Sequence, residues 1–328
     1  MSADNAIVKA GMKVAVVSCP ALGDTTLFLR LAWRLQAAGA QVTLVSASLS
    51  SIREHLPGVE VRGDVRPNLI KLAEDNDLVI CYIDWLIEAT KTGTDLSHLG
   101  NVAYLAGKKL PANLALDKRP VVVAGREVCA AHNVICRDTK AGKSMVQWID
   151  QYAEEVLGLD LLTPLPSFQF LPEVSDDASR RVAIFPTTPH ANKNYSSKGF
   201  QRLGRNLVGK GWVVEFVGIP AEQQTLQELY PDFMVHSFAE LKGLVNFLRT
   251  CSVVVSNDSG GGHLASLMGL RTFTITRRRP DFTWRPGFND MNRVVCPRFT
   301  FKWMGQTVWR PFIPLGQVLR EFPNVAGQ

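Results

Sequence analysis

Two segments of the sequence share one design, residues 28–46 (FLRLAWRLQAAGAQVTLVS) and residues 200–218 (FQRLGRNLVGKGWVVEFVG), and they align without a gap. In each segment, apolar residues at helical spacing lead to a glycine, Gly39 or Gly211, and then to an apolar run of strand length. Another apolar run precedes each helix, so each half predicts strand, helix and strand in turn. Such a unit needs parallel strands and a right-handed crossover. The repeat therefore predicts an α/β protein with two Rossmann-like domains.

The length of the chain agrees with two domains, because 328 residues exceed the roughly 150 that one ordinary core serves. Around residues 157–181 the sequence is rich in proline and ends in a polar tail, so we place the connection at 166–180. The domains are then expected at 1–165 and 181–328, with the last helix as a candidate for packing back on the N-terminal domain. Two such domains facing each other bind ligands in the cleft between them, at the carboxyl ends of the strands.

The composition is typical of a soluble globular protein, with 46% hydrophobic and 20% charged residues. No apolar run approaches the roughly 20 residues of a membrane span. The first residues, MSADNAIVKAG, lack the pattern of a signal peptide, so we expect a cytoplasmic protein. The net charge is +6, and part of the excess lies in TRRRPDFTWR (276–285). That stretch lacks a nucleic-acid recognition motif, so nucleic acid is not an expected partner.

The residues suited to metal binding are not grouped as a metal site requires. Cys129, His132 and Cys136 lie in CAAHNVIC, but no fourth ligand is nearby, and cysteine in an apolar run behaves as a small hydrophobic residue. Asp75 and Asp77 stand just before an apolar run, where an acidic residue commonly begins a buried strand. The sequence therefore predicts no metal site.

Two loops that follow expected strands contain groups suited to catalysis and anion binding. The loop 18–26 (SCPALGDTT) contains Gly23 and Asp24 before a helix expected from residue 27. Asp24 either caps this helix or presents a carboxylate to the cleft as a general base. The loop in 186–200 (PTTPHANKNYSSKGF) is either a solvated connection or an anion site beside a helix N-terminus. Its polar residues are Thr187, Thr188, Lys193 and Lys198.

A third loop, in SNDSGGGHLASLMG (256–269), is rich in glycine where a strand should lead into a helix. Glycine in an ordered element costs about 0.5–1 kcal/mol relative to alanine, so a run of glycines needs a reason. Close approach of a phosphate to the first amides of the helix is such a reason. Asp258 and Ser259 are residue types that cap helices, and His263 either contacts the phosphate or packs inward.

Together these loops resemble the signature of glycosyltransferase family 9, the bacterial ADP-heptose:lipopolysaccharide heptosyltransferases. ALGD (21–24) resembles the G-x-L-G-D stretch of that family, and KNYSSKGF (193–200) resembles its K-x-W-P-x-E-x-F. VGIPAE (217–222) resembles a family strand that ends in glycine with a glutamate four positions later. The glycine-rich loop resembles D-[ST]-G-x-x-H-L-A-A-x-x-G. The order and spacing of the four motifs span about 250 residues of the chain.

The resemblance implies a GT-B fold, with the N-terminal domain binding the acceptor and the C-terminal domain binding the nucleotide sugar. It implies inverting, metal-independent transfer of heptose from ADP-heptose to a lipopolysaccharide core acceptor, with no cofactor beyond the donor. Asp24 would be the general base, Glu222 would bind the ribose, and Asp258 would bind the sugar hydroxyls. The donor diphosphate would be held by Thr187, Thr188, Lys193, Ser259, Gly260, Gly261, Gly262 and His263.

The sequence departs from the family motifs in two places and leaves two alternative functions open. Tyr195 and Ser196 replace Trp and Pro, and RRRPDFTWRPGF (277–288) replaces G-P-T-D-P-x-x-W-G-P. Within that loop Arg277, Arg278 and Arg279 are candidates for contact with an anionic acceptor or an anionic lipid surface. A lipid-linked acceptor implies peripheral attachment at the inner face of the inner membrane. The rival readings are a GT-B transferase that uses another nucleotide sugar on a glycan or protein, and an inactive nucleotide-binding homologue.

Overall fold

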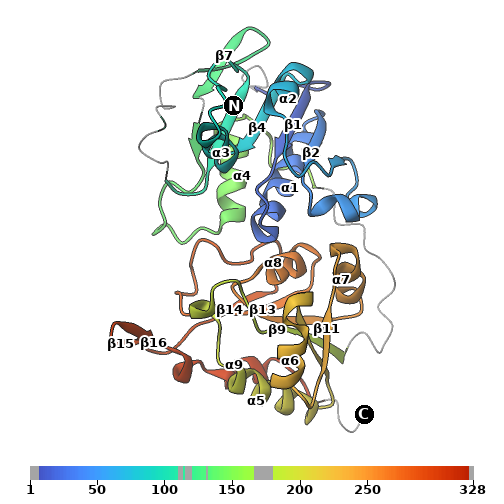
Figure 1. Ribbon diagram of the computed structural model, residues 1–328, viewed down its shortest axis with the longest axis vertical. Helices are drawn as coiled ribbons and strands as arrows, with labels where there is room; N and C mark the ends of the chain where they lie inside the picture. Colours follow the sequence, from blue (N-terminus) through green and yellow to red (C-terminus); the bar gives the residue numbers. More distant parts are fainter. Residues whose placement is uncertain (1–6, 110–113, 115–119, 131, 166–179, 325–328) are drawn as a thin grey trace. The chain divides into compact units, whose positions relative to one another are not determined.

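The computed structural model describes residues 7–109, 114, 120–130, 132–165 and 180–324. The chain divides into two compact units, Met1–Gln169 and Phe170–Gln328, coloured blue to green and yellow to red in Figure 1. The connection expected at 166–180 lies outside the described residues, apart from Arg180. None of the described helices has the length and apolarity that crossing a bilayer would require.

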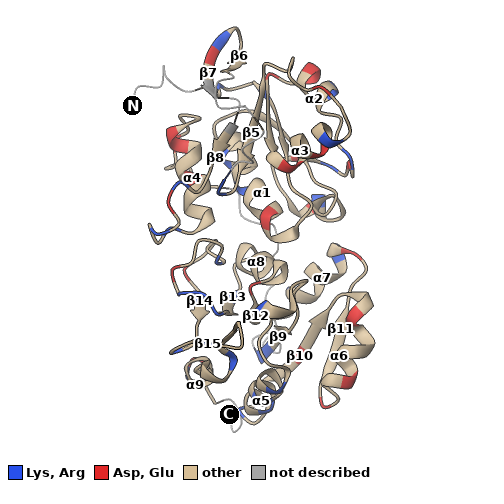
Figure 2. Ribbon diagram, turned by 60° about the vertical axis from the view of Figure 1, so that its left-hand side comes forward, with Lys and Arg blue, Asp and Glu red and all other residues tan. Residues whose placement is uncertain are grey.

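The N-terminal unit is built on a parallel sheet with the strand order β3-β2-β1-β4-β5-β8. Helices α1 and α4 pack together on one face of the sheet, and α2 and α3 cover the other (Figure 2). The strands are β1 (Lys13–Val17), β2 (Gln41–Val45), β3 (Glu60–Arg62), β4 (Leu78–Tyr82), β5 (Val102–Ala106) and β8 (His132–Val134). The helices are α1 (Leu22–Ala37), α2 (Leu69–Asp75), α3 (Ile83–Lys91), α4 (Met145–Glu155) and the 3-10 helix η2 (Leu49–His55).

The C-terminal unit repeats this plan, with the parallel strand order β11-β10-β9-β12-β13-β14. In both units the strands follow the Rossmann order, in which the third, second and first strands precede the fourth, fifth and sixth. The strands are β9 (Arg181–Phe185), β10 (Val213–Gly218), β11 (Met234–Ser237), β12 (Val253–Asn257), β13 (Arg271–Ile275) and β14 (Asn292–Val295). The α-helices are α5 (Ser197–Val208), α6 (Gln223–Leu229), α7 (Leu241–Leu248), α8 (Gly260–Leu267) and α9 (Leu315–Arg320). The 3-10 helices are η4 (Ala191–Lys193), η5 (Pro220–Glu222) and η6 (Arg310–Phe312).

Two antiparallel hairpins stand outside the parallel sheets. One pairs β6 (Pro120–Val123) with β7 (Arg126–Ala130), and the other pairs β15 (Phe301–Trp303) with β16 (Gln306–Val308). Each is a pair of strands without a third strand, so each depends on packing against the rest of its unit for stability.

The first helix confirms one prediction and corrects another. Gly39 has φ of +87°, and the amide of Ala40 donates to the carbonyl of Leu35, so the glycine ends the helix as predicted. The expected start at residue 27 is wrong, because α1 already begins at Leu22. The Thr25 hydroxyl donates to the carbonyl of Cys19 at 2.7 Å and fixes the chain where it leaves β1.

The last helix, α9, closes the core of its own unit. Val318 and Phe322 belong to the same buried cluster as Phe200 and Phe273, and the ring of Phe322 packs edge-on against Trp212 at 4.9 Å. The Lys210 ammonium donates to the carbonyls of Leu319 and Phe322 at 2.8 and 2.6 Å. The sequence had offered this helix as a candidate for packing on the N-terminal domain. The structure buries its apolar side in the C-terminal unit, and packing on the N-terminal domain stays a prediction.

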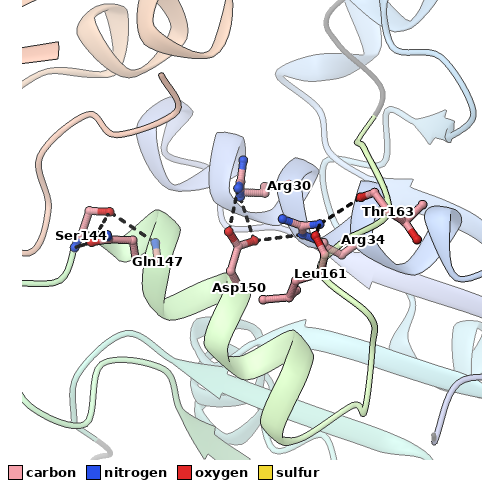
Figure 3. Close-up of polar contacts among 7 residues, drawn as sticks. All are labelled: Arg30, Arg34, Ser144, Gln147, Asp150, Leu161 and Thr163. Carbon is pink, nitrogen blue, oxygen red and sulfur yellow. Dashed lines mark hydrogen bonds and ion pairs between the residues drawn. The ribbon is translucent and has the colours of Figure 1, made fainter. Parts of the chain in front are cut away.

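A charged cluster ties α1 to α4 in the N-terminal unit (Figure 3). Arg30 forms two hydrogen bonds with the Asp150 carboxylate, at 2.9 and 2.6 Å, and Arg34 adds a third at 3.1 Å. Arg34 also donates to the carbonyls of Leu161 and Thr163. Burial alone would raise the pKa of Asp150, but the hydrogen bonds and charges of the two arginines lower it below its ordinary value. The cluster therefore fixes α4 and the following chain to the helix that carries Asp24.

We predict that Asp150→Asn lowers the free energy of unfolding at pH 7 by about 2–3 kcal/mol, because it leaves two partly buried arginines without their anion. The difference from the wild type should be complete above the ordinary carboxyl pKa of 3.8 and shrink as the pH falls through the lowered folded value. Urea unfolding over a range of pH measures it. Glu155→Gln is the matched control, because its pair with Arg137 is exposed and is worth at most about 1 kcal/mol. Equal losses in the two variants would contradict the prediction.

Candidate active site

Both units place their polar loops at the point where the strand order reverses. This point lies between β1 and β4 in the N-terminal unit and between β9 and β12 in the C-terminal unit. Loops after two such strands diverge and leave a crevice at the carboxyl edge of the sheet, where ligands of this fold bind. Asp24 follows β1, Lys193 follows β9 and Asp258 follows β12. The structure thus brings the predicted residues of each unit to the expected edge.

In the C-terminal unit, Thr187 in the loop after β9 contacts Glu222 in the loop after the neighbouring strand β10. The Thr187 hydroxyl donates to the Glu222 carboxylate at 2.9 Å, and the amide of Ile219 donates to the same oxygen at 3.3 Å. Thr188 turns inward and donates to Asn194 Oδ1 at 2.7 Å and to the His190 carbonyl at 3.0 Å. Glu222 therefore joins the loops after β9 and β10, and Thr188 braces the loop that leads to Lys193.

Lys193 and Asp258 form an ion pair at the start of α8. The Lys193 ammonium lies 3.9 Å from Asp258 Oδ2, and their side chains are 33% and 10% exposed. Ser259 is the N-cap residue of α8, but its side chain makes no capping bond, and its buried hydroxyl has no hydrogen-bond partner among the described residues. The first amides of α8 are therefore not capped by Ser259, and they lie beside a lysine, which is an arrangement suited to an anion.

The glycines of this loop have a packing role that the sequence did not reveal. A Cβ on Gly261 would lie 2.6 Å from the ring of Phe185, and a Cβ on Gly262 would collide with the hydroxyl of Ser256. Phe185 ends β9 and Ser256 lies in β12, so these two glycines let α8 approach the sheet closely. Room for a phosphate was the expected reason for the glycines. For Gly261 and Gly262 the structure gives contact with the protein's own strands.

His263 is buried, with 6% of its surface exposed. Burial lowers its pKa, which the charge of Asp258 and a hydrogen bond to the Trp284 backbone partly oppose, so the imidazole is neutral near pH 7. Its Nδ1 is buried without a hydrogen-bond partner among the described residues. Of the two possibilities left by the sequence, inward packing is the one that the structure shows directly.

Asn257 is a positioning residue that the sequence analysis missed. Its side chain is fully buried, and its amide nitrogen donates to the carbonyl of Pro186 at 2.6 Å. Its amide oxygen accepts from the backbone N–H of Tyr195 at 2.8 Å. The same side chain therefore holds both ends of the loop that carries Lys193. A polar residue at the end of the apolar strand CSVVVSN was the available signal.

Arg310, in the 3-10 helix η6, contacts the middle of the same loop. Its guanidinium donates to the carbonyl of Asn194 at 2.7 Å and to that of Ala191 at 3.1 Å. Tyr195, which departs from the family motif, packs against Trp309 at a ring distance of 6.2 Å. The position where this chain has Tyr195 in place of the family's Trp is therefore a packing contact in the core.

The N-terminal unit places Asp24 in a small cluster of titratable groups. Asp24 lies in the first turn of α1, whose N-cap is Ala21, so Asp24 is not the cap residue. Burial raises the pKa of the Cys19 thiol, and the charge of Asp24 and a hydrogen bond to it raise it further. The thiol is therefore protonated, and it donates to the carbonyl of Ala21 at 3.7 Å.

Asp84 is a second carboxylate at this edge, and the sequence analysis gave it no role. It lies in the first turn of α3, directly after β4, and burial raises its pKa, against the charge of Lys91. After burial, the charges of Asp84 and Asp24 both raise the pKa of Tyr82. The two carboxylates therefore act on one phenol from the two sides of the β1–β4 reversal.

The three candidate acceptor arginines, which follow β13, differ in their surroundings. Arg279 pairs with Asp281, with 3.2 Å between Nε and Oδ1, and Arg278 lies over the ring of Phe282. Arg277 is exposed and has no ion-pair partner among the described residues. The run is thus not a uniform basic surface, and Arg277 is the arginine whose charge is least compensated there.

Of the groups considered for metal binding, the structure describes the side chains of Asp75, Asp77 and Cys136. Asp77 accepts a hydrogen bond from the amide of Lys13, which opens β1 at the opposite edge of the sheet from Asp24. The side chains of Cys129 and His132 lie outside the described residues. Among the described residues no group of three or more His, Cys, Asp or Glu side chains is placed to hold a metal ion.

The family model of glycosyltransferase family 9 (heptosyltransferase) matches residues 130–298, which is just over half of the chain and contains the candidate loops after β9, β10 and β12. The chain belongs to glycosyltransferase family 9. The family predicted from the loop motifs is therefore confirmed, and with it the assignment as a glycosyltransferase. Asp24 lies outside the matched range. No curated protein matches the chain.

Solved structures of family 9 enzymes share the fold of the whole chain. The ADP-heptose lps heptosyltransferase II of E. coli is 18% identical over 94% of this chain and 97% of that one, with a TM-score of 0.66. A family 9 glycosyl transferase from Veillonella parvula is 16% identical over 96% and 97%, with a TM-score of 0.71. The E. coli heptosyltransferase WaaC with ADP is 17% identical over 94% and 98%, with a TM-score of 0.61. The predicted GT-B fold is confirmed.

For this family 9 enzyme we predict that Asn257→Ala destabilises the C-terminal unit by about 2–3 kcal/mol, because it removes two buried hydrogen bonds and leaves main-chain groups unpaired. Hydrogen exchange should become faster at the amide of Tyr195. Asn206→Ala is the matched control, because Asn206 is exposed and bonds only within α5. Unchanged exchange at Tyr195 would show that Asn257 does not hold the loop.

Proposed function

We propose that the protein is an inverting heptosyltransferase that moves heptose from ADP-heptose to a lipopolysaccharide core acceptor without a metal ion. The observation that carries the proposal is the Lys193 ammonium beside Asp258 at the start of α8, where the Ser259 side chain forms no cap. A cation and free helix amides suit a diphosphate, and a carboxylate beside them suits sugar hydroxyls. Solved relatives add support, since one of them is an ADP-heptose lps heptosyltransferase and another is a heptosyltransferase with ADP.

In the proposed reaction an acceptor hydroxyl attacks the anomeric carbon of the donor while the bond from that carbon to the phosphate oxygen breaks. Asp24 takes the proton of the hydroxyl, and ADP leaves with the electron pair of the broken bond. One displacement inverts the anomeric centre. The leaving diphosphate gains negative charge, which Lys193 and the amides from Ser259 to Gly262 stabilise where other enzymes use a metal. Thr187 completes the phosphate side, whereas Thr188 and His263, which turn inward, support these groups from behind.

Glu222 has a defined task in this proposal. Its carboxylate already organises the loops after β9 and β10 through Thr187 and Ile219. The position at the end of β10 is the one from which an acidic residue binds ribose hydroxyls in nucleotide-binding folds of this topology. Asp258, 10% exposed and beside Lys193, is proposed to bind the sugar.

The acceptor and the cellular location are also proposals. Arg277 is the arginine that we assign to an anionic group of the acceptor, because no ion-pair partner compensates its charge among the described residues. A lipid-linked acceptor would place the protein in the cytoplasm, at the inner face of the inner membrane.

We predict that ADP raises the melting temperature more than UDP, GDP or dTDP, in the presence of a chelator. At 100 times its Kd a ligand adds about 2.7 kcal/mol of stability. Lys193→Ala should abolish the shift, whereas Lys198→Ala, in the first turn of α5, is the control. A preference for another nucleotide would retain the GT-B transferase and discard the heptose donor, and no shift would favour an inactive homologue. The chelator matters because one structural relative, TibC from enterotoxigenic E. coli, is described as iron-containing.

We predict that Asp24→Asn lowers kcat by about 10²–10⁴-fold, the contribution of a positioned base, and leaves the ADP shift unchanged. Asp84→Asn is the matched control, because Asp84 is the other carboxylate at this edge. Steady-state assay of ADP release separates the two. A loss confined to Asp84→Asn would transfer the role of base to Asp84, and full activity in Asp24→Asn would refute the proposed mechanism.

A further inference from the structure

The β15–β16 hairpin carries large apolar side chains that face solvent. Met304 is 90% exposed and Trp303 64%, and Phe299 and Phe301 beside them are also exposed. Figure 1 shows the hairpin at the edge of the C-terminal unit, away from α8. A single exposed apolar residue needs no explanation, but four within six residues form a patch that does.

The hairpin stands on a fixed base. The amide of Arg298 donates to the carbonyl of Phe312 at 3.1 Å, and the rings of Phe299 and Phe312 lie 3.7 Å apart. At the other end of the hairpin, Trp309 is buried in the core of the unit with 1% of its surface exposed. The base thus has packing partners, whereas no ring or cation–π contact of Trp303 is found among the described residues.

The turn of the hairpin presents Met304 at its tip. Met304 and Gly305 have φ of +45° and +75°, the left-handed values of a two-residue hairpin turn. Glycine adopts such a φ readily, but methionine does so at a cost. The structure therefore keeps an apolar, strained residue at a fully exposed position, which favours a functional reason for the side chain.

Pairing within the hairpin separates apolar and basic residues. Phe301 lies opposite Val308, and Trp303 opposite Gln306, so both aromatic rings project to one side, while Lys302 projects to the other. Residues 291–320 contain no Asp or Glu, and their basic residues, blue in Figure 2, give the segment a positive charge. These residues are Arg293, Arg298, Lys302, Arg310 and Arg320.

This chemistry fits the surface of an anionic bilayer. Tryptophan favours the level of the lipid head groups, because its ring is apolar and its N–H is polar. Transfer of methionine and phenylalanine side chains from water to the boundary between head groups and acyl chains is favourable, and basic residues beside them are attracted to anionic lipids. An exposed hairpin tip inserts into a deformable surface more readily than it completes a protein pocket.

We propose that the β15–β16 hairpin is a membrane-docking element, in which Trp303 and Met304 enter the head-group region of an anionic bilayer and Arg298 and Lys302 bind the lipid head groups. The proposal identifies the attachment surface, and it does not depend on the sugar transfer, because the binding requires neither donor nor acceptor.

Co-sedimentation of the full chain with vesicles tests the proposal. We expect binding to vesicles of equal parts phosphatidylglycerol and phosphatidylcholine, and little binding to phosphatidylcholine alone. The double variant Trp303→Ala/Met304→Ala should bind vesicles at least about tenfold more weakly. Each substitution removes an apolar side chain that would be buried in the bilayer. Lys302→Gln should bind about fivefold more weakly. Brominated lipids should quench tryptophan fluorescence in the wild type and less in Trp303→Phe.

Met234→Ala is the matched control, because Met234 is 62% exposed on β11 of the same unit and should bind vesicles as the wild type does. Circular dichroism and the ADP shift verify that each variant is folded. Absence of wild-type binding to anionic vesicles, or equal binding by the double variant, would overturn the proposal. Self-association that the double variant abolishes, without vesicle binding, would also overturn it and identify the hairpin as an interface between copies of the chain.

Discussion

The proposed donor side of the site depends on one buried amide, that of Asn257. A buried amide must have its hydrogen bonds satisfied, and Asn257 meets this requirement with the carbonyl of Pro186 and the N–H of Tyr195, the two ends of the Lys193 loop. The loop thereby acquires one conformation without being part of a helix or strand. Asp258 is the next residue, so the side chain that fixes the lysine loop is the last of β12, and the carboxylate that pairs with the lysine directly follows the strand.

The two units use the same topology for different chemistry. At the reversal of strand order the N-terminal unit presents the carboxylates of Asp24 and Asp84, whereas the C-terminal unit presents Lys193, paired with Asp258, beside the start of α8. Carboxylates accept protons, and a lysine with helix amides stabilises anions. A displacement that releases a proton from one substrate and an anion from the other needs both kinds of group. Duplication of one fold therefore supplies two sites that can diverge in charge while the sheet remains the same.

Much of this arrangement could be predicted from the sequence because it follows from local patterns. The glycine stop at Gly39, the repeated strand–helix–strand units and the polar loops after strands depend on residues close together in the chain. What could not be predicted depends on contacts between distant segments. Gly261 is glycine because Phe185 lies against it, and Asn257 reaches Pro186 across the sheet. The start of α1 was misplaced because Gly23 and Asp24, read as loop residues, lie in its first turn.

Arg310 has a consequence for how mutations in this protein are interpreted. It follows β16 by two residues, and its guanidinium holds the carbonyls of Ala191 and Asn194, on either side of Lys193. A change at Arg310 frees two carbonyls that fix the position of an ammonium group it never touches. Kinetic constants measured for Arg310 variants would therefore resemble those of a residue that binds the proposed donor. Arg310 acts only by positioning the loop that carries Lys193.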